Sequence, residues 1–235
     1  LFSVPSVAGA ISQTNALPIV TENLVFWADA DNNDIGHTGT YMYNQVNGPQ
    51  SDSDNYRFYF PNAPSYNYQA TLDGRTVSYW DFDGTNDYIN AGTLRPLMTD
   101  TWRDNGFCGE MWLYPLSASD DGVCSFIKVD ASNHLHMRFH STHGFVVTFD
   151  SASGQVEMLD NSNAAFCQSF VNQWYHLAVQ ITNADKRSDQ QLQLWINGNL
   201  LLSASMDTKH FDASSAASAM FGWDDSNYYY GGYMK

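Results

Sequence analysis

Apolar and polar residues alternate over short segments of this chain, and turn-forming residues separate the segments. In HLHMRFH, residues 134–140, an apolar residue occupies every second position between three histidines and one arginine. Because successive side chains of a β-strand point to opposite faces of its sheet, this alternation predicts a strand with one buried face. The same pattern recurs along most of the chain, which predicts an all-β protein.

Segments of this kind number about a dozen, enough for two packed sheets. They cover residues 24–30, 56–60, 77–84, 87–92, 107–115, 124–129, 134–140, 145–150, 155–159, 173–181, 190–196, 199–205, 219–223 and 228–234. The polar stretch 31–55 is predicted to be a loop, and Pro61 and Pro64 are predicted to end the second strand. Asn197 and Gly198 give the strongest hairpin signal, because a type I′ turn needs two residues with positive φ.

The alternation also selects the side chains that fill the space between the sheets. Apolar residues that share a face within each predicted strand are expected to be buried together. The set expected in the core comprises Trp80, Phe82, Leu135, Met137, Phe139, Leu177, Val179, Leu194 and Ile196.

Composition restricts the partners of the chain. It has 235 residues and a net charge of −15, and only three of its acidic residues are glutamates. Nucleic acid is not expected as a partner, because phosphate binding needs a basic face, and an anionic membrane surface is disfavoured for the same reason. No apolar run approaches the length of a membrane span, so membrane insertion is not expected either.

The cysteines and the N-terminal residues carry less information. Cys108, Cys124 and Cys167 are odd in number and not closely spaced, which favours three buried thiols and leaves one disulfide bridge as the alternative. Residues 1–20 lack the basic start and continuous apolar run of a signal peptide. We interpret them as an extended arm at a processed or trimmed N-terminus, followed by one domain over residues 21–235.

Five segments, in order, resemble the motifs of one fold family. They are WDFDGTNDYINAG (80–92), FCGEMWLYP (107–115), QWYHLAVQI (173–181), LQLWINGNLL (192–201) and FGWDDSNYYYGGYM (221–234). Each is similar to a strand or hairpin motif of the laminin G-like, concanavalin A-like jelly rolls, and the resemblance is taken to extend over roughly residues 22–235. The resemblance implies an antiparallel jelly-roll β-sandwich of two sheets. Family members continue past the closing motif, whereas this chain stops at Lys235, so part of a sheet edge is expected to be unpaired.

The first of these motifs has a physical explanation that needs no chemistry. Phe82 is expected in the core, Asp83 and Gly84 make a turn, Asp87 accepts backbone N–H groups, and Tyr88 returns to the core. We therefore interpret this motif as structural.

The histidine-rich strand is the first candidate site. His134, His136, Arg138 and His140 share the polar face of residues 134–140, where they are expected to line a solvated or ligand-facing surface. A zinc ion needs three or four converging ligands, and Cys124 on the preceding strand or His143 in the next turn would have to join the histidines. We predict that the strand holds no transition metal.

Aspartates gather at two places where loops are expected. Asp29, Asp31 and Asp34 follow the first predicted strand, and Asp224 and Asp225 precede the last one. Carboxylate oxygens suit calcium, and the families that the chain resembles often bind one calcium ion at the rim of the sandwich. These residues form a candidate site for one structural Ca²⁺, with ordinary turn formation by Asp as the alternative. No other cofactor is expected.

Catalytic motifs are missing from the sequence. Glucanases of this fold carry glutamates and an aspartate alternating on one strand, whereas Glu22, Glu110 and Glu157 lie far apart. There is no G-x-S-x-G elbow, phosphate-binding loop or H-E-x-x-H motif. We therefore predict that the chain is not an enzyme.

Non-catalytic recognition or assembly remains as the predicted function. The first hypothesis is a structural or adhesive component of an extracellular phage or virus particle, such as a fibre, spike or decoration subunit. Its partners would be neighbouring protein subunits and host glycans. The alternative is a carbohydrate-binding module of a secreted or cell-surface bacterial protein, and a glycoside hydrolase of the same fold is the distant third.

Overall fold

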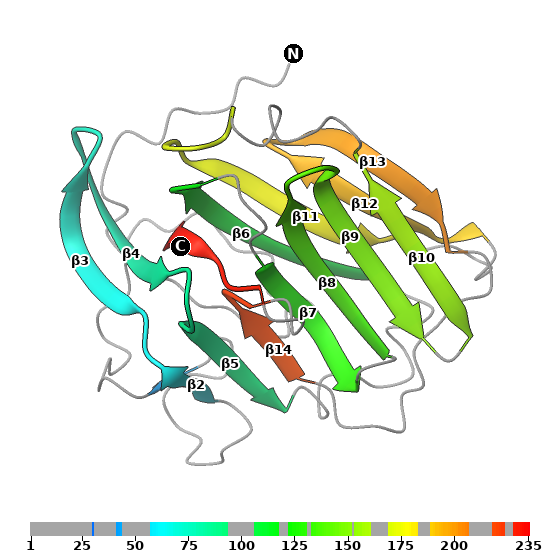
Figure 1. Ribbon diagram of the computed structural model, residues 1–235, viewed down its shortest axis with the longest axis horizontal. Helices are drawn as coiled ribbons and strands as arrows, with labels where there is room; N and C mark the ends of the chain where they lie inside the picture. Colours follow the sequence, from blue (N-terminus) through cyan, green and yellow to red (C-terminus); the bar gives the residue numbers. More distant parts are fainter. Residues whose placement is uncertain are drawn as a thin grey trace, which may run out of the picture.

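The chain folds into two antiparallel β-sheets, as the alternation predicted. The computed structural model describes residues 30, 41–43, 57–93, 106–117, 122–130, 133–151, 153–160, 169–182, 189–206, 218–223 and 228–235. The secondary-structure elements of these described residues are all β-strands. Figure 1 looks through the layers of this sandwich, with β7, β8, β9 and β10 running side by side.

The described strands of the first sheet number eight. From edge to edge they are β1 (Tyr41–Tyr43), β2 (Arg57–Asn62), β5 (Tyr88–Thr93), β14 (Ser218–Phe221), β7 (Gly122–Asp130), β8 (Asn133–His140), β9 (Gly144–Ser151) and β10 (Gly154–Leu159). Chain neighbours β7 to β10 form a meander. In contrast, β14 enters between β5 and β7 from far along the sequence, as the jelly-roll order requires.

The second sheet contains seven of the described strands. In order they are β13 (Asn199–Ser205), β12 (Gln191–Ile196), β11 (Tyr175–Ile181), β6 (Phe107–Pro115), β15 (Gly231–Met234), β4 (Arg75–Asp83) and β3 (Ser65–Leu72). The β12–β13 turn has positive φ at both Asn197 (50°) and Gly198 (75°), which confirms the predicted hairpin.

The core between the sheets contains the predicted side chains. All nine residues of the expected set are buried and belong to one apolar cluster. The largest fully buried side chains are aromatic and come from both sheets, including Phe82, Phe139 and Tyr175. Side chains of both inner faces interdigitate here. Because side chains alternate along each strand, the residues between the core positions lie on the outer faces.

Three strands differ from the prediction between residues 31 and 72. β1 lies within the stretch expected to be a loop. Pro61 does not end the second strand, because β2 runs to Asn62. β3 was not predicted, although Asp73 and Gly74 make a turn with φ of 51° and 73° that joins it to β4.

The structural interpretation of the first family motif is confirmed for all but one residue. Phe82 is buried, and the Asp87 carboxylate accepts the N–H of Asp83 at 3.0 Å. Tyr88 does not return to the core. Its neighbours Ile89 and Ala91 fill the core positions of β5, so alternation turns Tyr88 to the outer face.

The C-terminal strand does not lie at an edge of the sheet, so the prediction of an unpaired edge there was wrong. β15 is bonded on one side to β4 and on the other to β6, and Lys235 exchanges backbone hydrogen bonds with Trp112 at 2.9 and 3.0 Å. Figure 1 shows this C-terminal segment between β4 and β6. The closing motif therefore supplies a central strand.

Cys108 is also placed differently from the prediction of three buried thiols. It is a free cysteine and exposed, because β6 turns Met111 and Leu113 inward and its alternate residues outward. Nothing is described of the Cys124 side chain, and Cys167 lies outside the described residues.

Candidate functional site

The strand β8 presents its histidines on the outer side of the eight-stranded sheet. Leu135, Met137 and Phe139 point into the core, which confirms the predicted alternation. The alternate positions are partly exposed. We call this surface the histidine face and define it by His134, His136, Arg138 and His140.

Strand pairing determines which side chains flank the histidine face. His134 lies opposite Lys128 of β7 and Asp150 of β9. His136 lies opposite Ser125 and Thr148 in the same way.

The residues that flank the histidine face differ in accessibility. On the β9 side, Thr148 and Val146 are only 4% and 0% exposed. Lys128 on the β7 side is partly exposed. Next to His134, Lys128 and Asp150 are both partly exposed, whereas next to His136 and Arg138 the β9 residues are buried.

His134 and His136 form a stacked pair. Their ring centroids are 4.5 Å apart, and the ring planes differ by 7°. The pKa of His136 is lowered to about 3, chiefly by burial and also by the nearby His134 and Arg138. His136 is consequently neutral at physiological pH, and the fixed positive charges of this surface are those of Lys128 and Arg138.

His140 has a local structural partner. Its Nδ1 accepts the backbone N–H groups of Thr142 and His143 at 3.1 and 3.3 Å, across the turn into β9. Accepting these bonds requires an unprotonated Nδ1. This nitrogen is used by the turn, so His140 has less capacity for a ligand than its neighbours.

An aromatic cluster that the sequence analysis did not single out lies beside the histidine face. It consists of Tyr88, Trp223, Tyr228 and Tyr229. Trp223 and Tyr229 form an isolated β-bridge, and their rings stack at 5.9 Å with planes 8° apart. The Tyr88 ring lies 5.1 Å from that of Trp223.

Two cations connect the aromatic cluster to the strands β7 and β8. Lys128 Nζ lies 5.3 Å from the centre of the Trp223 ring, and Arg138 Cζ lies 5.2 Å from the centre of the Tyr228 ring. Both distances are typical of cation–π contacts. The site therefore combines aromatic rings, two cations and neutral imidazole on one surface.

Two hydrogen-bond donors in this site have no acceptor among the residues that the structure describes. Arg138 Nε and Trp223 Nε1 are buried and unpartnered in the described part of the structure. A buried donor without a partner costs about 1–3 kcal/mol. Both groups only donate, so the molecule that would satisfy them must carry acceptor oxygens.

The sequence contained only part of the signal for this site. The histidines and Arg138 stand out through their alternation. The sequence predicts Trp223, Tyr228 and Tyr229 only as strand residues. No local pattern indicates that β14 lies between β5 and β7, so the sequence does not show that these aromatic residues lie beside the histidine face.

The predicted calcium ligands are not tested. Asp29, Asp31, Asp34, Asp224 and Asp225 lie outside the described residues. Within the described residues, no group of three or more His, Cys, Asp or Glu side chains is arranged to hold a metal ion. The calcium site, and the prediction of no transition metal at the histidines, both stay predictions.

Membrane insertion through a helix has no support in the described residues, where no helix has the length and apolar character that a bilayer span needs.

Comparison with protein families identifies the fold family. A model of the concanavalin A-like lectin/glucanases superfamily of the laminin G type matches residues 83–235. The chain belongs to this superfamily. The matched residues include most of both sheets, the histidine face and Trp223. A comparison with curated proteins found no match.

Solved structures with the same fold are distant in sequence. Domain 4 of AbnA, an extracellular arabinanase from Geobacillus stearothermophilus, in complex with arabinotriose, aligns with a TM-score of 0.56 at 16% identity, covering 88% of this chain and 86% of that chain. The binding domain of Paraclostridial Mosquitocidal Protein 1 gives 0.58 at 13% identity, covering 92% and 48%.

A third similar structure is the binding domain of Botulinum neurotoxin DC in complex with SialylT. It gives a TM-score of 0.54 at 9% identity, covering 92% of this chain and 46% of that chain. This chain thus spans about half the length of the two toxin binding domains. At these identities the likeness establishes the fold alone.

Proposed function

We propose that this chain is a non-catalytic carbohydrate-recognition domain that binds glycans at the histidine face and the adjoining aromatic cluster. The observation that carries the proposal is the placement of Lys128 and Arg138 against the rings of Trp223 and Tyr228 on one outer surface. Ligand sites commonly combine aromatic side chains with a few oriented polar groups, and this surface has both.

The chemistry of a sugar matches this surface. The apolar C–H face of a sugar ring packs on an aromatic ring, while its hydroxyl oxygens accept hydrogen bonds. Trp223 and Tyr229 supply parallel rings, and Arg138 Nε and Trp223 Nε1 supply donors that lack acceptors. A small shift of the neighbouring rings would bring sugar oxygens to these two donors. The hydrogen bonds formed would then offset the free-energy cost of burying the donors without partners.

The similar structures support a glycan as the ligand. The arabinanase domain is in complex with arabinotriose, and one toxin binding domain is in complex with SialylT. Both share the fold of this chain. The choice between a phage or virus particle and a bacterial cell-surface protein stays a prediction, as does contact with neighbouring subunits.

The positions of the glutamates support a non-catalytic role. Glycoside hydrolases need two carboxyl groups within about 10 Å of each other, flanking one bond. Glu110 lies on β6 and Glu157 on β10, so the two described glutamates belong to different sheets. Both are exposed and alternate with core residues, so their side chains point away from each other across the sandwich.

A glycan array with matched variants tests the proposal. We expect the wild-type chain to bind a subset of glycans, and Trp223→Ala to lower that binding about tenfold or more. Tyr68→Ala is the control, because Tyr68 is an exposed aromatic residue on β3 of the other sheet. Binding that Trp223→Ala leaves at the wild-type level would contradict the assignment to this surface, and so would the absence of any bound glycan.

A further inference from the structure

The outer face of the seven-stranded sheet carries two tryptophans far from the histidine face. Trp112 of β6 is 41% exposed, and Trp195 of β12 is partly exposed. Strand β11 lies between them. Trp195 pairs with Ala178 of β11, and Trp112 pairs with His176 two residues away on the same strand. With strands about 4.8 Å apart and about 3.3 Å per residue, the two Cα atoms are roughly 12 Å apart.

The Trp195 ring is held in place by a chain of side-chain hydrogen bonds. Its Nε1 donates to Oε1 of Gln193 at 3.2 Å, and Gln193 Nε2 donates to Oε1 of Gln191 at 3.4 Å. Ser203 of β13 donates to the same Gln191 oxygen at 2.8 Å. This ladder fixes the indole before any ligand arrives and places amide groups along the strand beside it.

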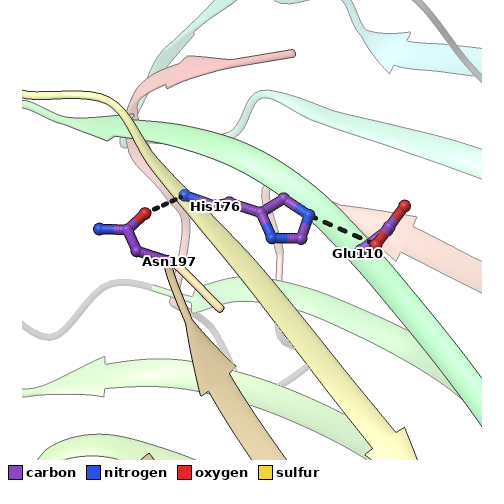
Figure 2. A network of polar contacts seen from close by, with 3 residues as sticks. All are labelled: Glu110, His176 and Asn197. Carbon is purple, nitrogen blue, oxygen red and sulfur yellow. Dashed lines mark hydrogen bonds and ion pairs between the residues drawn. The ribbon is translucent and has the colours of Figure 1, made fainter. Parts of the chain in front are cut away.

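Trp112 is held by a second polar network. Its ring lies 5.2 Å from that of His176, whose Nε2 is 3.4 Å from Oε2 of Glu110. The backbone of His176 is fixed by Asn197, which accepts its N–H at 2.9 Å and returns a bond to its carbonyl at 2.8 Å. Figure 2 shows His176 between Asn197 and Glu110.

The charge of this surface is low. Strands β11, β12 and β13 contain no Lys, Arg, Asp or Glu, although the chain as a whole has 25 acidic residues. The carboxylate of Glu110 interacts with His176, whose hydrogen bond lowers the pKa of Glu110. A surface with two oriented indoles, amides and one paired acid matches a neutral, hydroxyl-rich ligand better than a charged one.

We propose that this surface is a second carbohydrate-binding site, which binds an extended neutral oligosaccharide. We call it the tryptophan platform and define it by Glu110, Trp112, His176, Gln193 and Trp195. The separation of the two indoles requires a ligand longer than one sugar ring. The platform lies on the opposite side of the sandwich from the histidine face. The chain can therefore hold two glycans at once, and this site does not depend on the first.

Isothermal titration calorimetry with neutral oligosaccharides of increasing length tests the platform. Arabino-, xylo-, manno- and gluco-oligosaccharides serve as probes. For a series that binds, we expect affinity to rise with length until the ligand spans both indoles and then to level off. Trp112→Ala and Trp195→Ala should each lower the affinity about tenfold or more. Trp112→Phe and Trp195→Phe, which keep an aromatic ring, should lose less.

Two controls separate this inference from the proposed function. Tyr68→Ala, at an exposed aromatic residue outside both sites, should leave neutral oligosaccharide binding unchanged. Trp223→Ala removes an aromatic ring of the first site, and in that background Trp112→Ala and Trp195→Ala should still each lower the affinity for the neutral oligosaccharide. If Trp223→Ala abolishes all binding while both platform variants bind as the wild type does, the platform is refuted and the first site stands.

An aromatic sheet face can also bind a second copy of the chain. Light scattering of the wild-type chain distinguishes the two cases. We expect a mass that Trp112→Ala leaves unchanged. A wild-type dimer that Trp112→Ala dissociates would overturn the platform as a sugar site, as would the failure of every neutral series to bind.

Discussion

His136 is a partly buried histidine whose neutral state has consequences for stability. Its pKa in the folded chain is about 3, against about 6.5 for an unperturbed histidine. Between these values the unfolded chain binds a proton that the folded chain does not. The histidine therefore lowers the free energy of unfolding as pH falls below about 6.5.

Replacing this histidine should reduce the acid sensitivity of the fold. We expect His136→Gln to lose less stability than the wild type between about pH 6 and pH 4, by up to about 1.4 kcal/mol per pH unit. Urea unfolding at several pH values measures the difference, and His134→Gln is the control for a neighbouring ring. Parallel pH profiles for the wild type and His136→Gln would contradict the burial of a neutral imidazole.

Leu177 tests the phase of a strand at the centre of the seven-stranded sheet. It is fully buried and pairs with Met111 and Ile196. Leu177→Ala should lower the free energy of unfolding by about 2–5 kcal/mol, because it removes buried methyl groups and leaves a cavity. Gln180→Ala, on the outer face of the same strand, is the control. A loss below about 1 kcal/mol for Leu177→Ala would mean that the residue is not in the core.

Single residues show how far the alternation determines the structure. It correctly selected the core set and the polar face of β8, because burial on one side of a strand follows from local period. The predictions for Tyr88 and Cys108 were wrong because they followed residue type and not this alternation. Both are residue types that are often buried, and only the phase of neighbouring core residues turns them outward.

A β-hairpin could be predicted where the residues of its turn were recognised in the sequence. Asn197 and Gly198 gave the β12–β13 hairpin. Asp73 and Gly74 carry the same signal for β3 and β4, and the sequence-based prediction did not use it. The position of β14 between β5 and β7 had no local signal, because non-adjacent strand pairing is set by the whole sandwich. The aromatic cluster follows from that pairing and was therefore missed.

Gly222 connects β14 to the aromatic cluster and tests this part of the fold. Its φ is +83°, and an added Cβ would lie 2.5 Å from the buried Phe82 ring. Gly198 also has positive φ (+75°), but nothing lies within 4 Å of an added Cβ there.

The two glycines form a matched pair. Gly198→Ala should cost about 1–2 kcal/mol from backbone strain alone. Gly222→Ala should cost about 1–3 kcal/mol more, because it adds a clash in the core. Denaturant unfolding compares them, and equal losses would mean that Gly222 is not packed on Phe82.

The whole molecule is a sandwich whose two outer faces differ in chemistry. The histidine face and aromatic cluster carry cations and two donors that have no acceptor in the described part of the chain, whereas the tryptophan platform is nearly uncharged and hydrogen bonded within itself. Neither difference follows from the net charge of −15, which describes the chain as a whole. Recognition of two glycans on opposite faces would allow one chain to link two ligands.

The central claim is glycan binding at the histidine face, and the indole N–H signals of the seven tryptophans report on it most directly. In a ¹H–¹⁵N NMR titration with a glycan selected on the array, the signal of Trp223 should shift in a saturable way. Trp174 is the internal control, since its Nε1 is also buried without a partner but its ring lies against Tyr79 and Tyr114, outside both sites. A Trp223 signal that stays in place at saturation, while the glycan binds, would contradict the account.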